Sequence, residues 1–249
     1  MKVEAYIDYL VTWLKEQVER TGSKGLIVGV SGGIDSAVVA NLIKRACPDN
    51  SLGVIMPCNS NPQDQDDAEA VIAAAGVERK YVDLTSTREL MLLSVTSQMN
   101  PNADNLQLVD GNLRARLRMS TLYAIAQSYG YLVVGTDNAA EWYTGYFTKF
   151  GDGGVDLVPL VHVTKHGVAQ MAQTLQVPEQ VIHKAPSAGL WEDQTDEDEM
   201  GVSYAMIDAL LLGEDIPEEK RLIVERLHTM SAHKRTGAVQ PEQKPDYSL

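Results

Sequence analysis

The sequence has few cysteines and few basic residues, and both shortages limit what the protein can be. Only Cys47 and Cys58 occur, with no close pair and no histidine spacing suited to zinc, so we expect two ordinary reduced thiols. The 21 Lys and Arg against 34 Asp and Glu give a net charge of −13. This charge opposes non-specific binding to nucleic acid and to anionic membranes. Any anionic ligand must therefore be held by local groups.

A long apolar run is also missing from the N-terminus. Residues 1–24 carry scattered charges in an amphipathic pattern, which predicts a helix rather than a signal peptide or a membrane span. We therefore expect a cytoplasmic protein with no membrane or nucleic-acid partner. At 249 residues and 44% hydrophobic, the chain can bury one large core. We expect a single domain over 1–249, with 236–249 as a flexible tail.

The Walker phosphate loop is absent, because no G-x-x-x-x-G-K is followed by Ser or Thr. Instead, an apolar run at 26–30 ends in S-G-G-I-D-S at 31–36 and turns directly into an apolar helix. The glycines permit positive φ and close approach, so backbone N–H groups can form an anion-binding nest at the positive end of the helix. This pattern predicts a nucleotide-phosphate site. The simpler alternative is a helix cap in a tight turn.

The rest of the chain alternates predicted strands and helices. Strands are expected near 25–31, 52–57, 80–84 and 131–136, and the helices between them include 61–75 and 112–129. The alternation predicts an α/β fold, a doubly wound parallel sheet flanked by helices. Ligands of such sheets bind beyond the carboxyl ends of the strands. The loops after Val30 and Val134 should therefore meet the same ligand.

Acidic residues stand in both of these loops. Asp35 would repel phosphate unless a cation lay between them, and Glu141 follows in G-T-D-N-A-A-E at 135–141. Two carboxylates at neighbouring strand ends predict a Mg²⁺ site completed by phosphate oxygens and water. Taken alone, 136–138 would merely cap a short helix, and G-D-G-G at 151–154 would be an exposed acidic turn. The basic clusters at Arg114/Arg116/Arg118 and 233–235 would ordinarily be solvated surface.

The motifs together resemble the ammonia-dependent NAD synthetases, which are N-type ATP pyrophosphatases with an adenine-nucleotide hydrolase-like fold. The resemblance covers about 25–235. Two positions depart from the family pattern: His166, where Arg or Gln is usual, and Asn138, where His is common. The resemblance assigns a role to neither. The matching motifs are S-G-G-I-D-S, N-L-R-A-R-L-R-M, G-T-D-N-A-A-E, G-Y-F-T-K-F-G-D-G-G-V-D, K-A-P-S-A with Q-T-D-E, and H-K-R, in that order.

The resemblance implies contacts for each ligand. Asp152 is a further candidate, for taking a proton from bound ammonium, with a solvated turn acid as the equal alternative. The expected catalytic groups are Asp35, Glu141 and Lys165, with Asp152 as the further candidate; the implied Mg²⁺ ligands are Asp35 and Glu141; the implied ATP contacts are Gly29, Val30, Ser31, Gly32, Gly33, Ile34, Asp35, Ser36, Thr136, Lys165 and Ser187; and the implied deamido-NAD contacts are Arg116, Lys149, Asp156, His233 and Lys234.

The implied reaction is the amidation of deamido-NAD to NAD. The nicotinate carboxylate attacks the α-phosphorus of ATP, pyrophosphate leaves, and ammonia displaces AMP from the acyl-adenylate. We expect free ammonia as the donor unless a separate glutaminase subunit exists, because the synthetase pattern begins about 25 residues from Met1 and only a short tail follows it. Three alternatives are another enzyme with this loop, amidating or thiolating, a non-catalytic adenine-nucleotide-binding module, and a purely structural protein, which is hardest to reconcile with the glycine loop.

Two further expectations concern assembly and motion. The resemblance implies a homodimer with deamido-NAD at its interface, and 112–129 carries apolar residues on several faces, which favours a buried neighbour. The alternative is a core helix covered on both sides by its own chain. The segment 186–200 combines Pro, Gly and six acids, which predicts a mobile lid.

Overall fold

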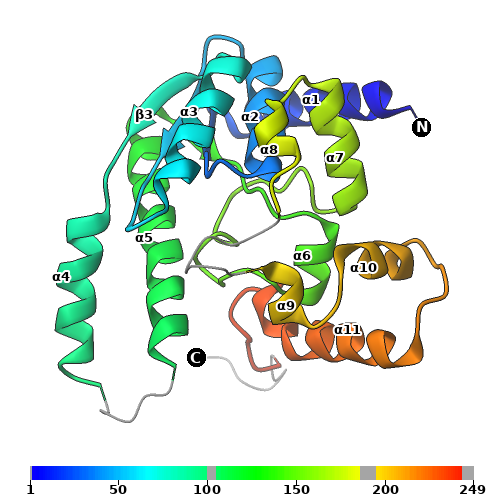
Figure 1. Ribbon diagram of the computed structural model, residues 1–249. Coiled ribbons are helices and arrows are strands. Elements are labelled where there is room, and N and C mark those ends of the chain that lie inside the picture. Colours follow the sequence, from blue (N-terminus) through cyan, green and yellow to red (C-terminus); the bar gives the residue numbers. More distant parts are fainter. Residues whose placement is uncertain (1, 100–104, 186–194, 243–249) are drawn as a thin grey trace.

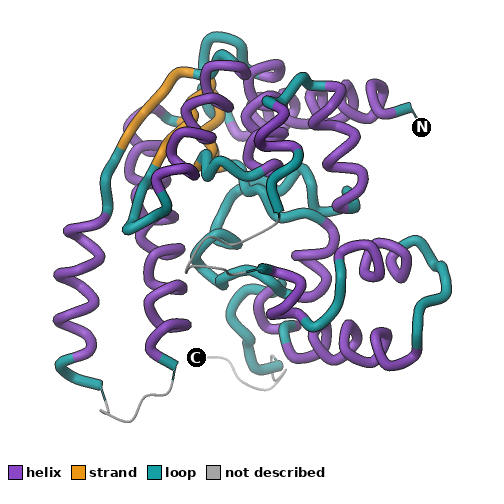
Figure 2. The backbone as a smooth tube through the Cα atoms, in the orientation of Figure 1, coloured by secondary structure: helices purple, strands orange, loops and turns teal. Residues whose placement is uncertain are grey.

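The computed structural model describes residues 2–99, 105–185 and 195–242, which form a four-stranded parallel sheet flanked by helices (Figures 1 and 2). The strand order is β3-β2-β1-β4. The two central strands are buried on both faces, as parallel strands between helical layers are. The strands are β1 (Gly25–Gly29), β2 (Ser51–Ile55), β3 (Glu78–Tyr81) and β4 (Tyr131–Val133).

Helices cover both faces of this sheet. One face carries α2 and α3, with α1 and α7 packed outside α2, and the other face carries α5 (Figure 1). The helices are α1 (Val3–Thr21), α2 (Ile34–Ala46), α3 (Pro62–Ala75), α4 (Thr85–Thr96), α5 (Leu106–Tyr129), α6 (Ala139–Thr144), α7 (Lys165–Thr174), α8 (Glu179–Ile182), α9 (Asp196–Met200), α10 (Tyr204–Leu211) and α11 (Glu218–Met230), with a 3₁₀ turn, η1, at Ala232–Lys234.

Strand periodicity decides which core each residue joins. Leu26 and Val28 of β1 point to the α1/α2/α7 side, whereas Ile27 between them joins the cluster under α5. A third apolar cluster brings together α6, α10 and α11 around Tyr204 and Ile207. This third cluster attaches the C-terminal helices to the loop that follows β4.

The expected fold class is confirmed, with differences at the element ends. Each predicted strand is present and ends earlier than expected, and α5 begins at Leu106 rather than near 112. Because β1 pairs in parallel with both β2 and β4, the strand order reverses beside β1. The loops after β1 and β4 therefore lie next to each other, as predicted. No helix in the described ranges is both long enough and apolar enough to cross a membrane.

Candidate nucleotide and metal site

The loop between β1 and α2 has a backbone that only glycine fits. Gly32 has φ +81°, and a Cβ there would lie 2.5 Å from the backbone oxygen of Asp64 in the first turn of α3. The Ser36 hydroxyl donates to Gly33 O at 2.9 Å and accepts from Ser31 N at 3.2 Å. These contacts shape the loop, while the N-cap Gly33 supplies no side-chain acceptor to the first N–H groups of α2. Those N–H groups suit a phosphate.

Three predicted residues meet at the end of this loop. Lys165 Nζ, from the start of α7, donates to Asp35 Oδ2 at 2.6 Å and to Glu141 Oε1 at 3.3 Å. The three side chains are only 13–16% exposed. A single ammonium thus reaches both carboxylates, so Asp35 and Glu141 are close enough to share one cation.

Asn138 fixes the positions of the Asp35 and Glu141 carboxylates relative to each other, a role that the sequence did not predict. Its side-chain N–H donates to Asp35 Oδ1 at 2.9 Å, and its side-chain oxygen accepts from the N–H groups of Ala140 and Glu141. Asn138 N donates back to Glu141 Oε2 at 3.1 Å, which completes a capping box at α6. The N-x-x-E spacing indicates this cap from sequence; the bond to Asp35 depends on the fold.

The electrostatics of the cluster suit a cation. Burial raises the pKa of Glu141 to about 7, although the neighbouring Lys165 opposes the rise. Burial would lower the pKa of Lys165, but the charges of Asp35 and Glu141 outweigh it and raise that pKa above its ordinary value. The donors are all carboxylate oxygens, which Mg²⁺ prefers. The described residues contain no group of three or more His, Cys, Asp or Glu placed to hold a metal, so phosphate and water would have to complete the site.

Two residues of α10, absent from the sequence argument, also contact this cluster. The Tyr204 hydroxyl lies 3.1 Å from Glu141 Oε1 and 2.8 Å from Asp196 Oδ2. Asp208 accepts from the backbone N–H groups of Lys165 and His166 at 3.1 and 3.0 Å. No sequence motif marks either residue, because each lies more than 35 residues from the group it contacts in α6 or α7.

The predicted basic contacts are brought together from three segments. Lys149 Nζ donates to His233 O, and Arg116 donates to Lys149 O at 3.3 Å. Lys234 Nζ donates to Gly145 O and Phe147 O at 2.8 and 2.7 Å, and burial lowers its pKa. These residues form one cationic cluster near the loop that follows α6.

The run Arg114/Arg116/Arg118 is not a single basic surface. Arg114 is buried and paired with Asp110 at 2.7 Å, and Arg118 donates to Met56 O and Ser60 Oγ, each at 3.1 Å. Arg116 alone of the three is exposed. The reason is the helical period, which turns positions 114 and 118 to one face of α5 and position 116 away from it.

Two acidic residues, Asp137 and Asp152, lie between the lysine–carboxylate cluster and the cationic cluster. Asp137 is 3% exposed, and its Oδ2 has no hydrogen-bond partner in the part of the chain that the structure describes. Burial, together with the charges of Asp152 and Glu141, raises its pKa well above the ordinary value. Asp152 is exposed and accepts from Thr148 N at 2.7 Å. No motif in the sequence singles out Asp137. A buried carboxylate oxygen without a partner among the described residues is unusual, so Asp137 is a further candidate for the site.

The other predicted contacts have different surroundings. Asp156 accepts from Val133 N at 2.8 Å and from Tyr123 at 3.0 Å, so its carboxylate is joined to β4 and α5. Thr136 lies in the loop between β4 and α6, partly buried. Ser187 and the first part of the predicted lid, 186–194, lie outside the described residues. The last part of that segment forms α9, with Asp196 and Met200 buried.

Fold and site together define a class: an α/β nucleotide-binding protein with a glycine phosphate loop and a lysine–carboxylate cluster at adjoining strand ends. The family model for NAD synthase matches residues 6–238, and the chain belongs to this family. The chain is 53% identical to the NH(3)-dependent NAD(+) synthetase of Alkaliphilus oremlandii, over 96% of this chain and 98% of that relative. It is 47% identical to the enzyme of that name from Mesoplasma florum, over 98% of each chain.

Solved structures agree with this assignment. NMN synthetase from Francisella tularensis superposes with a TM-score of 0.92 at 40% identity, covering 98% of this chain and 100% of that one. NH3-dependent NAD synthetase from Campylobacter jejuni, in complex with nitrate, gives a TM-score of 0.78 at 28% identity, covering 97% and 100%. Membership of this family makes the chain a ligase. The comparisons do not favour the two alternatives of a thiolating enzyme and a non-catalytic nucleotide-binding module.

Proposed function

We propose that the protein catalyses the ATP-dependent amidation of deamido-NAD with ammonia to give NAD, AMP and pyrophosphate. The observation that carries the proposal is the Asp35–Lys165–Glu141 cluster beside the phosphate loop, in a chain that matches NH(3)-dependent relatives over nearly their full length. Two anions, the nicotinate carboxylate and the α-phosphate, must approach each other in the first step. Catalysis therefore rests on positioning and on neutralising charge.

Each group has a distinct task in this proposal. The N–H groups at the start of α2 bind ATP phosphates. The Lys165 ammonium neutralises negative charge on the phosphates that leave as pyrophosphate. Asp35 and Glu141 would hold Mg²⁺, which supplies charge neutralisation at the phosphates when it is bound. The cationic cluster of Arg116, Lys149, His233 and Lys234 binds the pyrophosphate and carboxylate of deamido-NAD. Asp152 remains the candidate proton acceptor for ammonium.

The test is a product assay with two nitrogen donors. The protein is incubated with ATP, Mg²⁺ and deamido-NAD, with either ammonium or glutamine, and NAD, AMP and pyrophosphate are quantified. We expect equal amounts of all three products with ammonium and none of NAD with glutamine. AMP release that does not depend on deamido-NAD would overturn the assignment.

A second substrate is favoured by one finding. The superposition on NMN synthetase, at a TM-score of 0.92, makes nicotinate mononucleotide a second candidate for the substrate that is amidated, in place of deamido-NAD. Both substrates present the same carboxylate to the adenylating site and differ only in the AMP half. The ratio of kcat/KM for the two substrates decides between them, since deamido-NAD as the natural acceptor requires the higher value.

We also propose a homodimer, formed through α4 and the first turns of α5. Leu90 and Leu93 of α4 are each 70% exposed, and Leu106 and Leu108 of α5 are about half exposed. No residue of α4 is buried, which is unusual for a helix carrying so many apolar side chains. Figure 1 shows α4 and the lower part of α5 extending beyond the sheet. A second copy of the chain would cover this surface.

The rest of α5 packs on its own core along one side. Leu117, Leu122 and Tyr123 contact the apolar cluster formed with β1, β2 and β4, and within 112–129 only Arg114, Leu122 and Ala126 are buried. The proposed cytoplasmic location is supported by the ATP-dependent reaction and by the two free thiols, Cys47 and Cys58.

A further inference from the structure

Helix α10 contacts the lysine–carboxylate cluster at two points, one helical turn apart. At its first residue, the Tyr204 hydroxyl reaches Glu141 Oε1 at 3.1 Å, and the Tyr204 ring centroid lies 4.7 Å from Lys165 Nζ. At Asp208, four residues later, the carboxylate accepts from the backbone N–H groups that begin α7, including that of Lys165. One face of α10 therefore contacts both the backbone and the side chain of Lys165.

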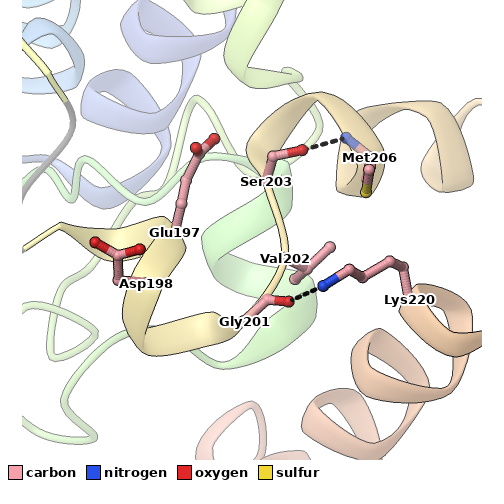
Figure 3. Close-up of a pocket in the computed structure, with 7 residues that line it drawn as sticks. All are labelled: Glu197, Asp198, Gly201, Val202, Ser203, Met206 and Lys220. Atoms are coloured by element: carbon pink, nitrogen blue, oxygen red, sulfur yellow. Dashed lines mark hydrogen bonds between the residues drawn. The ribbon is translucent and has the colours of Figure 1, made fainter.

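The position of α10 is itself fixed on several sides. Glu197 accepts from Tyr204 N at 2.8 Å, and Ser203 caps the helix by accepting from Met206 N at 3.4 Å. Lys220 of α11 donates to Gly201 O at 2.9 Å, just before the helix starts. Figure 3 shows Glu197, Ser203 and Lys220 among the residues that line a pocket between α9, α10 and α11. Tyr204 is 4% exposed, so its hydroxyl has little freedom to choose other partners.

The Tyr204 hydroxyl carries one hydrogen but lies within bonding distance of two carboxylates. Glu141 Oε1 is 3.1 Å away and Asp196 Oδ2 is 2.8 Å away. The hydroxyl thus joins a predicted metal ligand to the segment that begins α9. Without it, the one contact left to Glu141 Oε1 among the described residues would be the longer one with Lys165, at 3.3 Å. The carboxylate would then have more rotational freedom, which costs metal affinity.

We propose that Tyr204 is a positioning residue for the cation site: its hydroxyl orients Glu141, its ring face orients the Lys165 ammonium, and Asp208 anchors the helix that carries Lys165. The alternative is that Tyr204 only fills the apolar cluster with Ile207 and Val224. The two roles separate in Tyr204→Phe, which keeps the ring and its packing and removes only the hydroxyl. The inference rests on the proposed function for the identity of the cation and the nucleotide.

The test measures binding of Mn²⁺, as a probe for Mg²⁺, to the full chain with ATP, by titration with electron paramagnetic resonance detection. We expect Tyr204→Phe to weaken Mn²⁺ binding about tenfold, with an unchanged melting temperature, and high Mg²⁺ to restore most of kcat. Tyr131→Phe is the matched control, because Tyr131 donates to Asn50 at 3.1 Å, at the amino end of β4 away from the site, and it should bind Mn²⁺ like the wild type. Wild-type Mn²⁺ affinity in Tyr204→Phe would overturn the proposal.

Asp208→Asn provides an independent variant. It keeps one acceptor oxygen but loses the charge that faces the two N–H groups of α7. Because α7 carries Lys165, ATP should then bind several-fold more weakly, while the protein still folds. Unchanged ATP affinity in this variant would remove Asp208 from the proposal. The binding measurements do not need turnover. If the wild type binds Mn²⁺ and ATP but makes no NAD, the proposed function fails and the comparison of Tyr204→Phe with wild type still decides the inference.

Discussion

At the scale of single residues, the site is organised around donors that two carboxylates share. One ammonium serves two carboxylates, and one asparagine joins the same two carboxylates through its amide and through the cap of α6. Such a network is stabilising only when every member has its partner. Replacing a carboxylate by its amide removes the charge but keeps an acceptor oxygen for the same donors, so the change should affect chemistry more than stability.

Asp35→Asn and Glu141→Gln test the proposed metal ligands. Each keeps the shape of the side chain but removes a charged oxygen ligand, so NAD formation should fall by about a hundredfold or more while the circular dichroism spectrum stays native. Asp8→Asn, at an exposed position on α1, is the control and should retain full activity. Near-normal adenylate formation by either variant at ordinary Mg²⁺ would remove that residue from the metal site.

Glu141 also predicts a pH dependence. Its pKa of about 7 lies above the ordinary value, so the carboxyl is increasingly protonated as the pH falls below 7, and a protonated carboxyl is a poor ligand. Binding of Mn²⁺ with ATP should strengthen from about pH 6 to about pH 8 and then level off. Glu141→Gln should bind weakly and lose this dependence. A wild-type profile that is flat across the same range would contradict the assignment.

The cationic cluster predicts a defect confined to one substrate. Arg116→Ala and Lys234→Ala should each weaken deamido-NAD binding about ten- to a hundredfold, because each removes a charge-assisted contact, and should change ATP binding much less. Isothermal titration with each ligand measures both effects. Lys234 also donates to Gly145 O and Phe147 O, so its variant needs a melting curve alongside. Unaltered deamido-NAD affinity in both variants would show that the cationic cluster does not bind this substrate.

At the scale of elements, the phosphate loop depends on the helix that packs against it. The first two turns of α3 lie against Gly32, and Lys184 pairs with Asp64 and Asp67 of these turns, each at 2.7 Å. Asp67 is 2% exposed and also accepts from Gln63. The loop thus has a fixed wall on one side, so its conformation is set by tertiary packing as well as by its glycines.

Gly32→Ala separates these two influences. It should destabilise the fold by about 1–3 kcal/mol and weaken ATP binding, because its Cβ would meet Asp64 O at 2.5 Å. Gly213→Ala is the matched control: Gly213 has nearly the same φ, +82°, with nothing within 4 Å of an added Cβ, so only the backbone cost of about 1 kcal/mol should remain. Urea unfolding measures both. Equal losses in the two variants would mean that α3 imposes no constraint.

At the scale of the whole molecule, the extended α4–α5 pair bears on assembly. Leu90→Glu places a charge in the exposed apolar surface and should convert the proposed dimer to monomer without lowering the stability of the chain itself, since Leu90 is 70% exposed. Light scattering after size-exclusion chromatography measures the mass. Leu222→Glu, on α11 at 57% exposure, should leave the mass unchanged. A wild-type monomer at micromolar concentration would refute the homodimer.

The sequence determined the local features. The apolar run before S-G-G-I-D-S and the alternation of strands and helices are short-range patterns, and both predicted their elements correctly. The adjacency of the loops after β1 and β4 also followed, because the order of a doubly wound sheet has few alternatives. The phosphate loop and the pair Asp35 and Glu141 were therefore accessible from sequence.

Only the tertiary structure decided which long-range partners complete the site. Asn138, Tyr204 and Asp208 reach the cluster because α6, α7 and α10 pack together, and no local spacing encodes a hydrogen bond between residues 43 or 103 positions apart. The pairing of Arg114 with Asp110, by contrast, is an i,i+4 contact within α5, and the helical period leaves Arg116 exposed. Local patterns reflect backbone geometry, which repeats every two or 3.6 residues; contacts between elements reflect burial and charge pairing, which depend on how the whole chain folds.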